Sequence, residues 1–435
     1  MGICITDFGA VSDGKTICTK EIQNAVEAAR KNNEAVNIPP GTFLTGTIDI
    51  SGASLCLEKG AILKGSANME DYPANSFVHN EMGPVQALIV CFDSEHIKIF
   101  GEGIIDLSGS TFFDFNKPIL PEVPLNEEQT KECTVHRDAR PNQCLFFHKV
   151  KHLTVCDITI IDAPCWTITF SECTDVKALD LTIENCLNIP NNDGIHVCAC
   201  DGVIISGCHF SCADDCVAIS AITNWEKPCE NIVVSDCVFR SRSKAIVVGY
   251  VHSHVRNVLI NNVVIRESNR GFCIMCNPKT GLVENVRVSN MVLETQVAAG
   301  IYWGNGEAVL IMSLDQEKHV PIEQRPARNE SINVRNISLH DIYCNTENAL
   351  GIVGCNNNIG DISLRDIVIR RKPSKNLSLK GEVLDMEPNP GRYKVPAGCG
   401  LYIEEAHNVS VSGIRMEGFK DIITKNVSTA ESMDL

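Results

Sequence analysis

The chain has 435 residues and a formal net charge of −16, with 38 Lys+Arg against 54 Asp+Glu. Apolar residues make up 44% of the sequence and charged residues 21%, a globular composition that excludes a disordered chain. The acidic balance argues against a nucleic-acid partner, and it fits poorly with a long anionic polymer as substrate.

The sequence contains no run of 18 apolar residues, so we expect no membrane span. Its first residues, MGICITDFGAVSDGK, have neither a basic region nor a long apolar stretch, so we expect no secretory signal. We therefore expect a cytoplasmic protein in which the 22 cysteines are reduced and mostly buried as small apolar residues. We expect no metal or other cofactor.

The first predicted element is an amphipathic helix over residues 19–33, with Ile22, Ala25, Val26 and Ala29 on one face. Further along the chain, residues 107–142 lack any periodic pattern. We predict a long loop there that leaves the main body and shapes a cleft.

A short pattern of alternating apolar residues recurs along the chain, with most copies starting 23 to 29 residues apart. Alternation predicts strands, and the central SG, SD, NN, SN, HD and RD pairs predict bends between two short strands. The copies are LTVCDITI at 153–160, VKALDLTI at 176–183, VIISGCHF at 203–210, IVVSDCVF at 232–239, VLINNVVI at 258–265, VRVSNMVL at 286–293, ISLHDIYC at 337–344, ISLRDIVI at 362–369 and VSVSGIRM at 409–416.

This period is too short for a propeller blade of about 40–45 residues, and no helix recurs inside it. The pattern predicts an all-β, right-handed parallel β-helix that forms one domain over residues 1–435. The 19–33 helix would cap its N-terminal end. We expect Cys208, Cys237 and Cys344 to point inward. Because β-helices can associate laterally, a homo-oligomer is compatible with this fold.

A second strand of each copy places charged residues in one column. In the strings DGIHV, DCVAI, KAIVV and RGFCI, the equivalent positions are Asp193, Asp215, Lys244 and Arg270, and Asp214 precedes Asp215. Stacked coils lie about 4.8 Å apart, so the carboxylates should be close together. Paired carboxylates are what glycosidic cleavage needs, one as an acid and one to activate water. The alternative is that these Asp residues end strands and pair with Lys244.

Further residues are candidates for the same site. His196 follows Asp193 on one strand and would orient a carboxylate or bind a sugar hydroxyl, or be structural. The string YWGNGE at 302–307 brings Trp303, a candidate sugar platform, close to Glu307. The alternative for Trp303 is a packed aromatic at a coil corner. Trp166 precedes TITF on the equivalent strand before Asp193 and is a similar candidate, with a core position as the alternative.

At these residues the chain resembles glycoside hydrolase family 28, the polygalacturonases and rhamnogalacturonan hydrolases. The segments FGAVSDGKT, PPGTFLTG, LEKGAILKGS and GEGIIDLSG look like the family's N-terminal coils, and Asn191-Asn192-Asp193-Gly194 matches its Asn-x-Asp-Gly motif. The resemblance implies that Asp214 is the general acid. It also implies that Asp193 and Asp215 hold and activate water in one inverting displacement, without metal.

Two family motifs are absent. Lys244 stands where the family has the histidine of Gly-His-Gly, and Cys273-Ile274-Met275 replaces its Arg-Ile-Lys clamp. We expect Arg242, Lys244 and Arg270 to form a local basic cluster suited to one uronate, unless Arg270 pairs with a neighbouring Asp.

The main hypothesis is a glycoside hydrolase for short oligosaccharides derived from pectin or rhamnogalacturonan. One alternative is a polysaccharide lyase on the same fold, with Lys244 or Arg270 as the base. The other is a non-catalytic β-helix that binds glycans.

Overall fold

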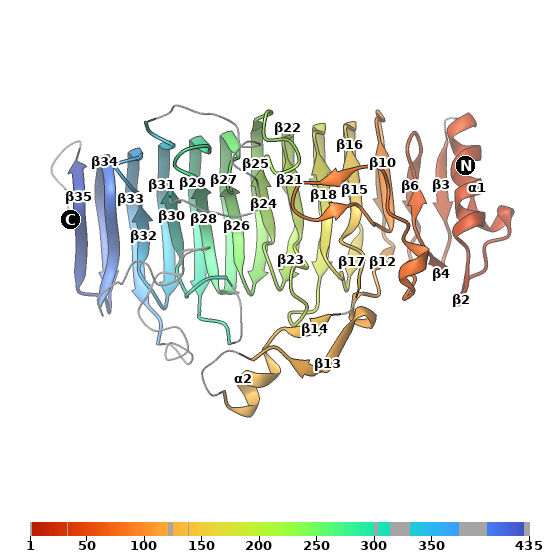
Figure 1. Ribbon diagram of the computed structural model, residues 1–435, viewed down its shortest axis with the longest axis horizontal. Helices are drawn as coiled ribbons and strands as arrows, with labels where there is room; N and C mark the ends of the chain where they lie inside the picture. The colour runs from red at the N-terminus through yellow and green to blue at the C-terminus, as the bar shows by residue number, and fades with distance from the viewer. Residues whose placement is uncertain are drawn as a thin grey trace.

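The computed structural model describes residues 2–32, 34–120, 125–137, 139–299, 303–313, 331–373 and 398–429. The chain coils into a right-handed parallel β-helix, in which 31 strands form one continuous sheet, as predicted. Figure 1 shows the coils stacked along one axis, with the two ends of the chain at opposite ends of the stack.

Each coil contributes strands to three parallel stacks. The stack that carries the candidate site contains β5 (Ile48–Asp49), β10 (Ile89–Phe92), β15 (Gln143–His148), β18 (Trp166–Ser171), β21 (Ile195–Cys198), β24 (Val217–Ser220), β26 (Lys244–Gly249), β28 (Arg270–Cys276), β30 (Val309–Ser313) and β32 (Leu350–Val353). The second contains β1 (Ile3–Cys4), β3 (Ala35–Ile38), β6 (Ser54–Leu57), β11 (Lys98–Gly101), β16 (Lys151–Cys156), β19 (Thr174–Leu179) and β22 (Asp201–Ser206). The third contains β2 (Asp13–Ile17), β4 (Gly41–Thr45), β7 (Ala61–Gly65), β12 (Ile104–Asp106), β17 (Thr159–Ile161), β20 (Thr182–Glu184) and β23 (His209–Cys212).

Later coils join the second and third stacks into single bent strands. These are β25 (Cys229–Ser241), β27 (His254–Ser268), β29 (Leu282–Thr295), β31 (Val334–Thr346) and β33 (Ile359–Arg371). β34 (Cys399–Glu417) runs through all three stacks, and β35 (Asp421–Thr429) pairs along it. The predicted bend residues have positive φ, for example Asp236 at 57°, Asn262 at 53° and Gly207 at 69°. Asn, Asp and Gly tolerate this left-handed conformation, which explains why these pairs recur in the sequence.

Inward-pointing side chains of all three stacks form one hydrophobic core. Cys208, Cys237 and Cys344 belong to it, as predicted. All 22 cysteines lie in the described part of the chain as thiols and not as disulfides, and all but Cys4 and three others are buried. The cysteines therefore serve as small apolar core residues.

Helix α1 (Thr19–Asn32) lies over the N-terminal end of the stack (Figure 1). Its Ile22, Ala25, Val26 and Ala29 are fully buried, so the predicted capping helix is confirmed. In the described ranges we find no helix that is both long and apolar enough to cross a membrane.

The 107–142 insertion leaves the β-helix, and it contains regular elements (Figure 1). It contains the 3-10 helix η3 (Gly109–Phe112), the antiparallel strands β13 (Phe113–Pro118) and β14 (Val135–Arg137), and the short helix α2 (Glu127–Lys131). Asn126 and Gln129 form a reciprocal capping box that starts α2. The insertion docks on a turn next to the candidate site, because the Asn188 side chain donates to the carbonyls of Lys131 and Cys133 at 2.8 and 2.7 Å.

A small hairpin covers part of the face that carries the site. Its antiparallel strands are β8 (Val78–His79) and β9 (Gly83–Pro84), and the 3-10 helix η2 (Met69–Asp71) precedes it. Phe77 packs on Phe146 of β15 with ring centroids 5.1 Å apart, and Asn80 donates to the carbonyl of Ile222 at 2.6 Å. The hairpin therefore spans several coils on the N-terminal side of the Asp residues.

Candidate active site

The four charged residues stand in one column. Ile195 pairs with Val217, Val217 with Ile246, and Lys244 with Arg270. Backbone bonds extend this register into the turns, since the amide of Gly194 donates to the carbonyl of Asp215 at 2.8 Å. The column predicted from the sequence is confirmed.

Local chemistry fixes the turn before β21. A Cβ on Gly194 would lie 2.3 Å from the carbonyl oxygen of Cys216, so only glycine allows these coils to approach so closely. The buried Asn192 side chain accepts from the amide of Ala213 at 2.7 Å and donates to the carbonyl of Cys186 at 2.7 Å. These contacts hold Asp193 beside the next coil.

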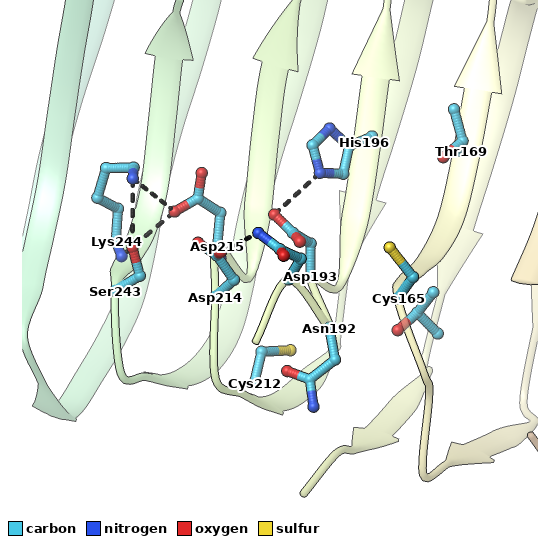
Figure 2. Close-up of polar contacts among 12 residues, drawn as sticks. Cys165, Thr169, Asn192, Asp193, His196, Cys212, Asp214, Asp215, Ser243 and Lys244 are labelled. Atoms are coloured by element: carbon cyan, nitrogen blue, oxygen red, sulfur yellow. Dashed lines mark hydrogen bonds and ion pairs between the residues drawn. The ribbon is translucent and has the colours of Figure 1, made fainter. Parts of the chain in front are cut away.

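Asp193, Asp214 and Asp215 bring their carboxyl groups together at the edge of the sheet (Figure 2). One oxygen from each lies within 4.8 Å of the others, and the three residues are only 4%, 6% and 8% exposed. The Asn191 amide donates to Oδ2 of Asp214 at 3.3 Å. The 4.8 Å limit refers to one oxygen of each group, whereas the roughly 6.5–9.5 Å usual for inverting glycosidases is measured between whole carboxyl groups.

Lys244 lies on one side of this triad. Its Nζ is 3.3 Å from Oδ1 of Asp215 and donates to Oγ of Ser243 at 3.2 Å. It also lies 5.8 Å from the ring centroid of Trp303, and Ser243 Oγ donates to the Trp303 carbonyl at 3.2 Å. Lys244 therefore compensates part of the negative charge of the triad.

His196 lies on the other side, with Nε2 3.0 Å from Oδ2 of Asp193 (Figure 2). Its ring stacks on Trp166 with centroids 3.4 Å apart and planes 8° from parallel, and His79 meets the same indole edge-on at 5.0 Å. Burial lowers the pKa of His196 to about 3, so a neutral imidazole contacts Asp193 at neutral pH. His196 therefore lies beside the carboxyl group of Asp193, and its predicted role there stays a prediction.

Asp193 resists ionisation. Burial, followed by the nearby Asp215 carboxylate, raises its pKa well above the ordinary value. Asp193 therefore keeps its proton beside the carboxyl group of Asp215, an arrangement suited to acid–base chemistry.

The raised pKa of Asp193 predicts a stability effect. The pKa of Asp193 is higher in the folded chain than in the unfolded chain, where the pKa of an Asp side chain is about 3.9. Between these two pKa values the folded state binds more protons, so stability falls as pH rises. We expect Asp193→Asn to raise the Tm at neutral pH, with a gain that shrinks toward about pH 4.

Thermal unfolding followed by circular dichroism over a pH series measures this difference. The exposed Asp7, in the 3-10 helix η1 (Ile5–Phe8) far from the site, provides the control variant Asp7→Asn. A Tm difference for Asp193→Asn that does not change with pH would contradict the assignment.

A pocket surrounds the triad. The structure brings the following predicted residues to its wall: Trp166, Asn191, Asp193, His196, Asp214, Asp215, Lys244 and Trp303. It adds residues that the sequence reasoning missed: Glu81, Ala218, Ser220, Ile222, Val247, Gly249 and Tyr250. The position of Trp166 could be predicted from the strand register, because β18 pairs with β21 so that Trp166 lies beside Asp193.

The predicted basic cluster is wrong. Arg270 and Glu307 are both 0% exposed, and they form a buried ion pair with Nε–Oε2 at 3.3 Å and Nη2–Oε1 at 3.4 Å. Neither residue lines the pocket. A buried guanidinium requires a charged partner, and Glu307 is the partner of Arg270. Arg242 turns instead toward the insertion, where Nη1 lies 2.9 Å from Oε2 of Glu132. Lys244 alone of the three lies at the pocket.

The triad is also the group of described residues with the right spacing for a metal ion. Carboxylate oxygens suit a hard cation, but the ammonium of Lys244 already lies against Asp215 and would repel one. The donor set thus fits proton transfer better than metal binding.

The model of glycosyl hydrolases family 28 matches residues 29–380, and the chain belongs to this family. It is 23% identical over 384 residues to an exo-poly-alpha-D-galacturonosidase of Dickeya chrysanthemi. That match covers 78% of this chain and 62% of the Dickeya protein, so the chain spans less than two thirds of that relative's length.

Solved structures share the fold. A family 28 exopolygalacturonase of Yersinia enterocolitica superposes with a TM-score of 0.69 and 18% identity, covering 100% of this chain and 78% of the other. An exopolygalacturonase from Thermotoga maritima gives a TM-score of 0.66 and 23% identity, covering 86% and 88%. At these identities the likeness establishes the β-helix.

Proposed function

We propose that this chain hydrolyses glycosidic bonds of short oligosaccharides derived from pectin or rhamnogalacturonan, by an inverting mechanism. One observation carries the proposal: three buried carboxyl groups from adjacent coils converge within 4.8 Å at a pocket walled by Trp166 and Trp303. Family membership supports it, and buried like charges are costly without a catalytic purpose.

In this mechanism Asp214 gives its proton to the glycosidic oxygen as the bond to the anomeric carbon breaks. Asp193 and Asp215 hold a water molecule, whose oxygen attacks the anomeric carbon while one of its protons passes to the carboxylate of Asp215. The products are a free hydroxyl on the leaving sugar and a hemiacetal of opposite configuration. The acid and the base then return to their starting states by proton exchange with solvent.

Two features favour short substrates or chain ends. The β8–β9 hairpin covers the sheet on the N-terminal side of the triad, through contacts with Phe146, Trp166 and Ile222. On the C-terminal side, Cys273 and Met275 lie in a buried apolar cluster on the same stack. The net charge of −16 adds repulsion against a long polyanion.

The test is a panel of pectic, rhamnogalacturonan and neutral oligosaccharides of increasing length, with products followed by NMR. We expect the inverted anomer to appear before mutarotation, and turnover to be faster on short chains than on polymer. An unsaturated product would overturn the proposal in favour of a lyase, and binding without turnover would favour a glycan-binding protein. The structure does not favour a lyase base, because Lys244 contacts Asp215 and Arg270 is buried with Glu307.

We further propose that the protein works in a reducing compartment such as the cytoplasm. The support is that all 22 cysteines are thiols and not disulfides, mostly in buried positions. Mass measurement of protein isolated without reductant, after alkylation, would count the free thiols, and a set of disulfides would overturn this proposal.

A further inference from the structure

Arg140 lies at the end of the 107–142 insertion, just before β15, and is only 8% exposed. Its guanidinium donates to the carbonyl of Pro164, to the carbonyl of Pro190 at 2.8 Å, and to Oδ1 of Asn191 at 3.1 Å. It also lies 5.5 Å from the ring centroid of Phe113. A buried arginine with this many acceptors is held in one orientation.

The contact with Asn191 has a chemical consequence. The two ends of an asparagine amide have nearly the same shape, and only the hydrogen bonds decide which end points where. A guanidinium only donates, so it fixes Oδ1 of Asn191 on its own side and turns Nδ2 away. Nδ2 then donates to Oδ2 of Asp214 at 3.3 Å. Asn191 itself has a φ of 59°, a left-handed conformation that asparagine tolerates.

We propose that Arg140 is a positioning residue, which orients the Asn191 amide so that it holds the carboxyl group of Asp214 for proton transfer. This deepens the proposed function and rests on it. Arg140 contacts no reacting atom, and its effect reaches the acid through Asn191. The insertion thereby contributes to the site through a residue at its base.

The test separates positioning from a purely structural role, since Arg140 also ties together the turns at Pro164 and Pro190. Arg140→Lys keeps the charge but cannot reach all three acceptors in a planar fork. We expect kcat to fall about 10-fold or more with KM within about 3-fold, as for a misplaced catalytic group. In an Asn191→Ala background, the same change should alter kcat by less than about 2-fold, because the route to Asp214 is already lost.

Arg415→Ala is the matched control, since this arginine is exposed on β34 and far along the stack from the triad. Equal losses of kcat for Arg140→Lys in both backgrounds would overturn the proposal, whatever the change in Tm. A crystal structure of Arg140→Lys gives a readout independent of activity. We expect the Asn191 Nδ2–Asp214 Oδ2 distance to exceed about 3.5 Å, and an unchanged contact would contradict the proposal. Wild-type protein without hydrolytic activity would refute the proposed function, while this structural readout would still test Arg140.

Discussion

Replacing Asp214 with asparagine is expected to lower kcat by about 10²–10⁴-fold, because an amide cannot give a proton to the leaving oxygen. The fold should not suffer, since the substitution keeps the shape of the side chain and removes one carboxyl group from a buried cluster of three. The measurement is kcat on the best oligosaccharide from the panel, with Tm recorded for the same preparation. Asp7→Asn is again the control. Full activity in Asp214→Asn would refute the assignment of Asp214 as the acid.

A good leaving group distinguishes an acid from the residues that hold water. The phenolate of an aryl glycoside is a good leaving group that departs without being protonated. Asp214→Asn should therefore lose much less activity on such a substrate than on an oligosaccharide. Asp193→Asn and Asp215→Asn should lose similar factors on both substrates, because attack by water is still needed. If Asp193→Asn were the variant rescued by the aryl leaving group, the roles of Asp193 and Asp214 would have to be exchanged.

The fold could be predicted from the sequence because its signals are local and repeated. Alternating apolar residues define each strand, and an Asn, Asp or Gly with positive φ, such as Asp236, Asn262 or Gly207, marks each bend. The helix over residues 19–33 was equally clear. By contrast, the β8–β9 hairpin is held by contacts such as that of Asn80 with the carbonyl of Ile222, 142 residues away. No local pattern encodes such a contact.

The residues of the site could be predicted from the sequence as far as the strand register could be predicted. Alignment of successive coils placed Asp193, Asp215 and Lys244 in one column. If the alignment is extended by one coil in each direction, the column also includes Trp166 and Glu307. That extension would have shown a carboxylate beside Arg270. Burial could not be read from the register, because a column of charges looks the same in sequence whether it is exposed or buried. Arg140 carried no signal, since its partners come from distant turns.

Replacing Lys244 with methionine is expected to cost about 3 kcal/mol of stability at neutral pH, the usual cost of leaving one buried charge without its partner. Lys244 and Asp215 are 5% and 11% exposed at the side chain, so solvent compensates little of the loss. The nearby ammonium also opposes the rise in the pKa of Asp193, so its removal raises that pKa further. The folded variant then binds more protons than the unfolded chain over a wider pH range. The stability deficit should therefore grow as pH rises from about 4 to neutrality.

Adding Asp215→Asn to Lys244→Met provides the control, because it removes the unpaired carboxylate. We expect the double variant to recover most of the lost stability in denaturant unfolding at neutral pH, but none of the activity. Kinetics separate this role from substrate binding. A lysine that gripped a uronate carboxylate would mainly raise KM when removed, whereas a partner of Asp215 should mainly lower kcat. A large rise in KM with unchanged stability would show that Lys244 serves the substrate and not the triad.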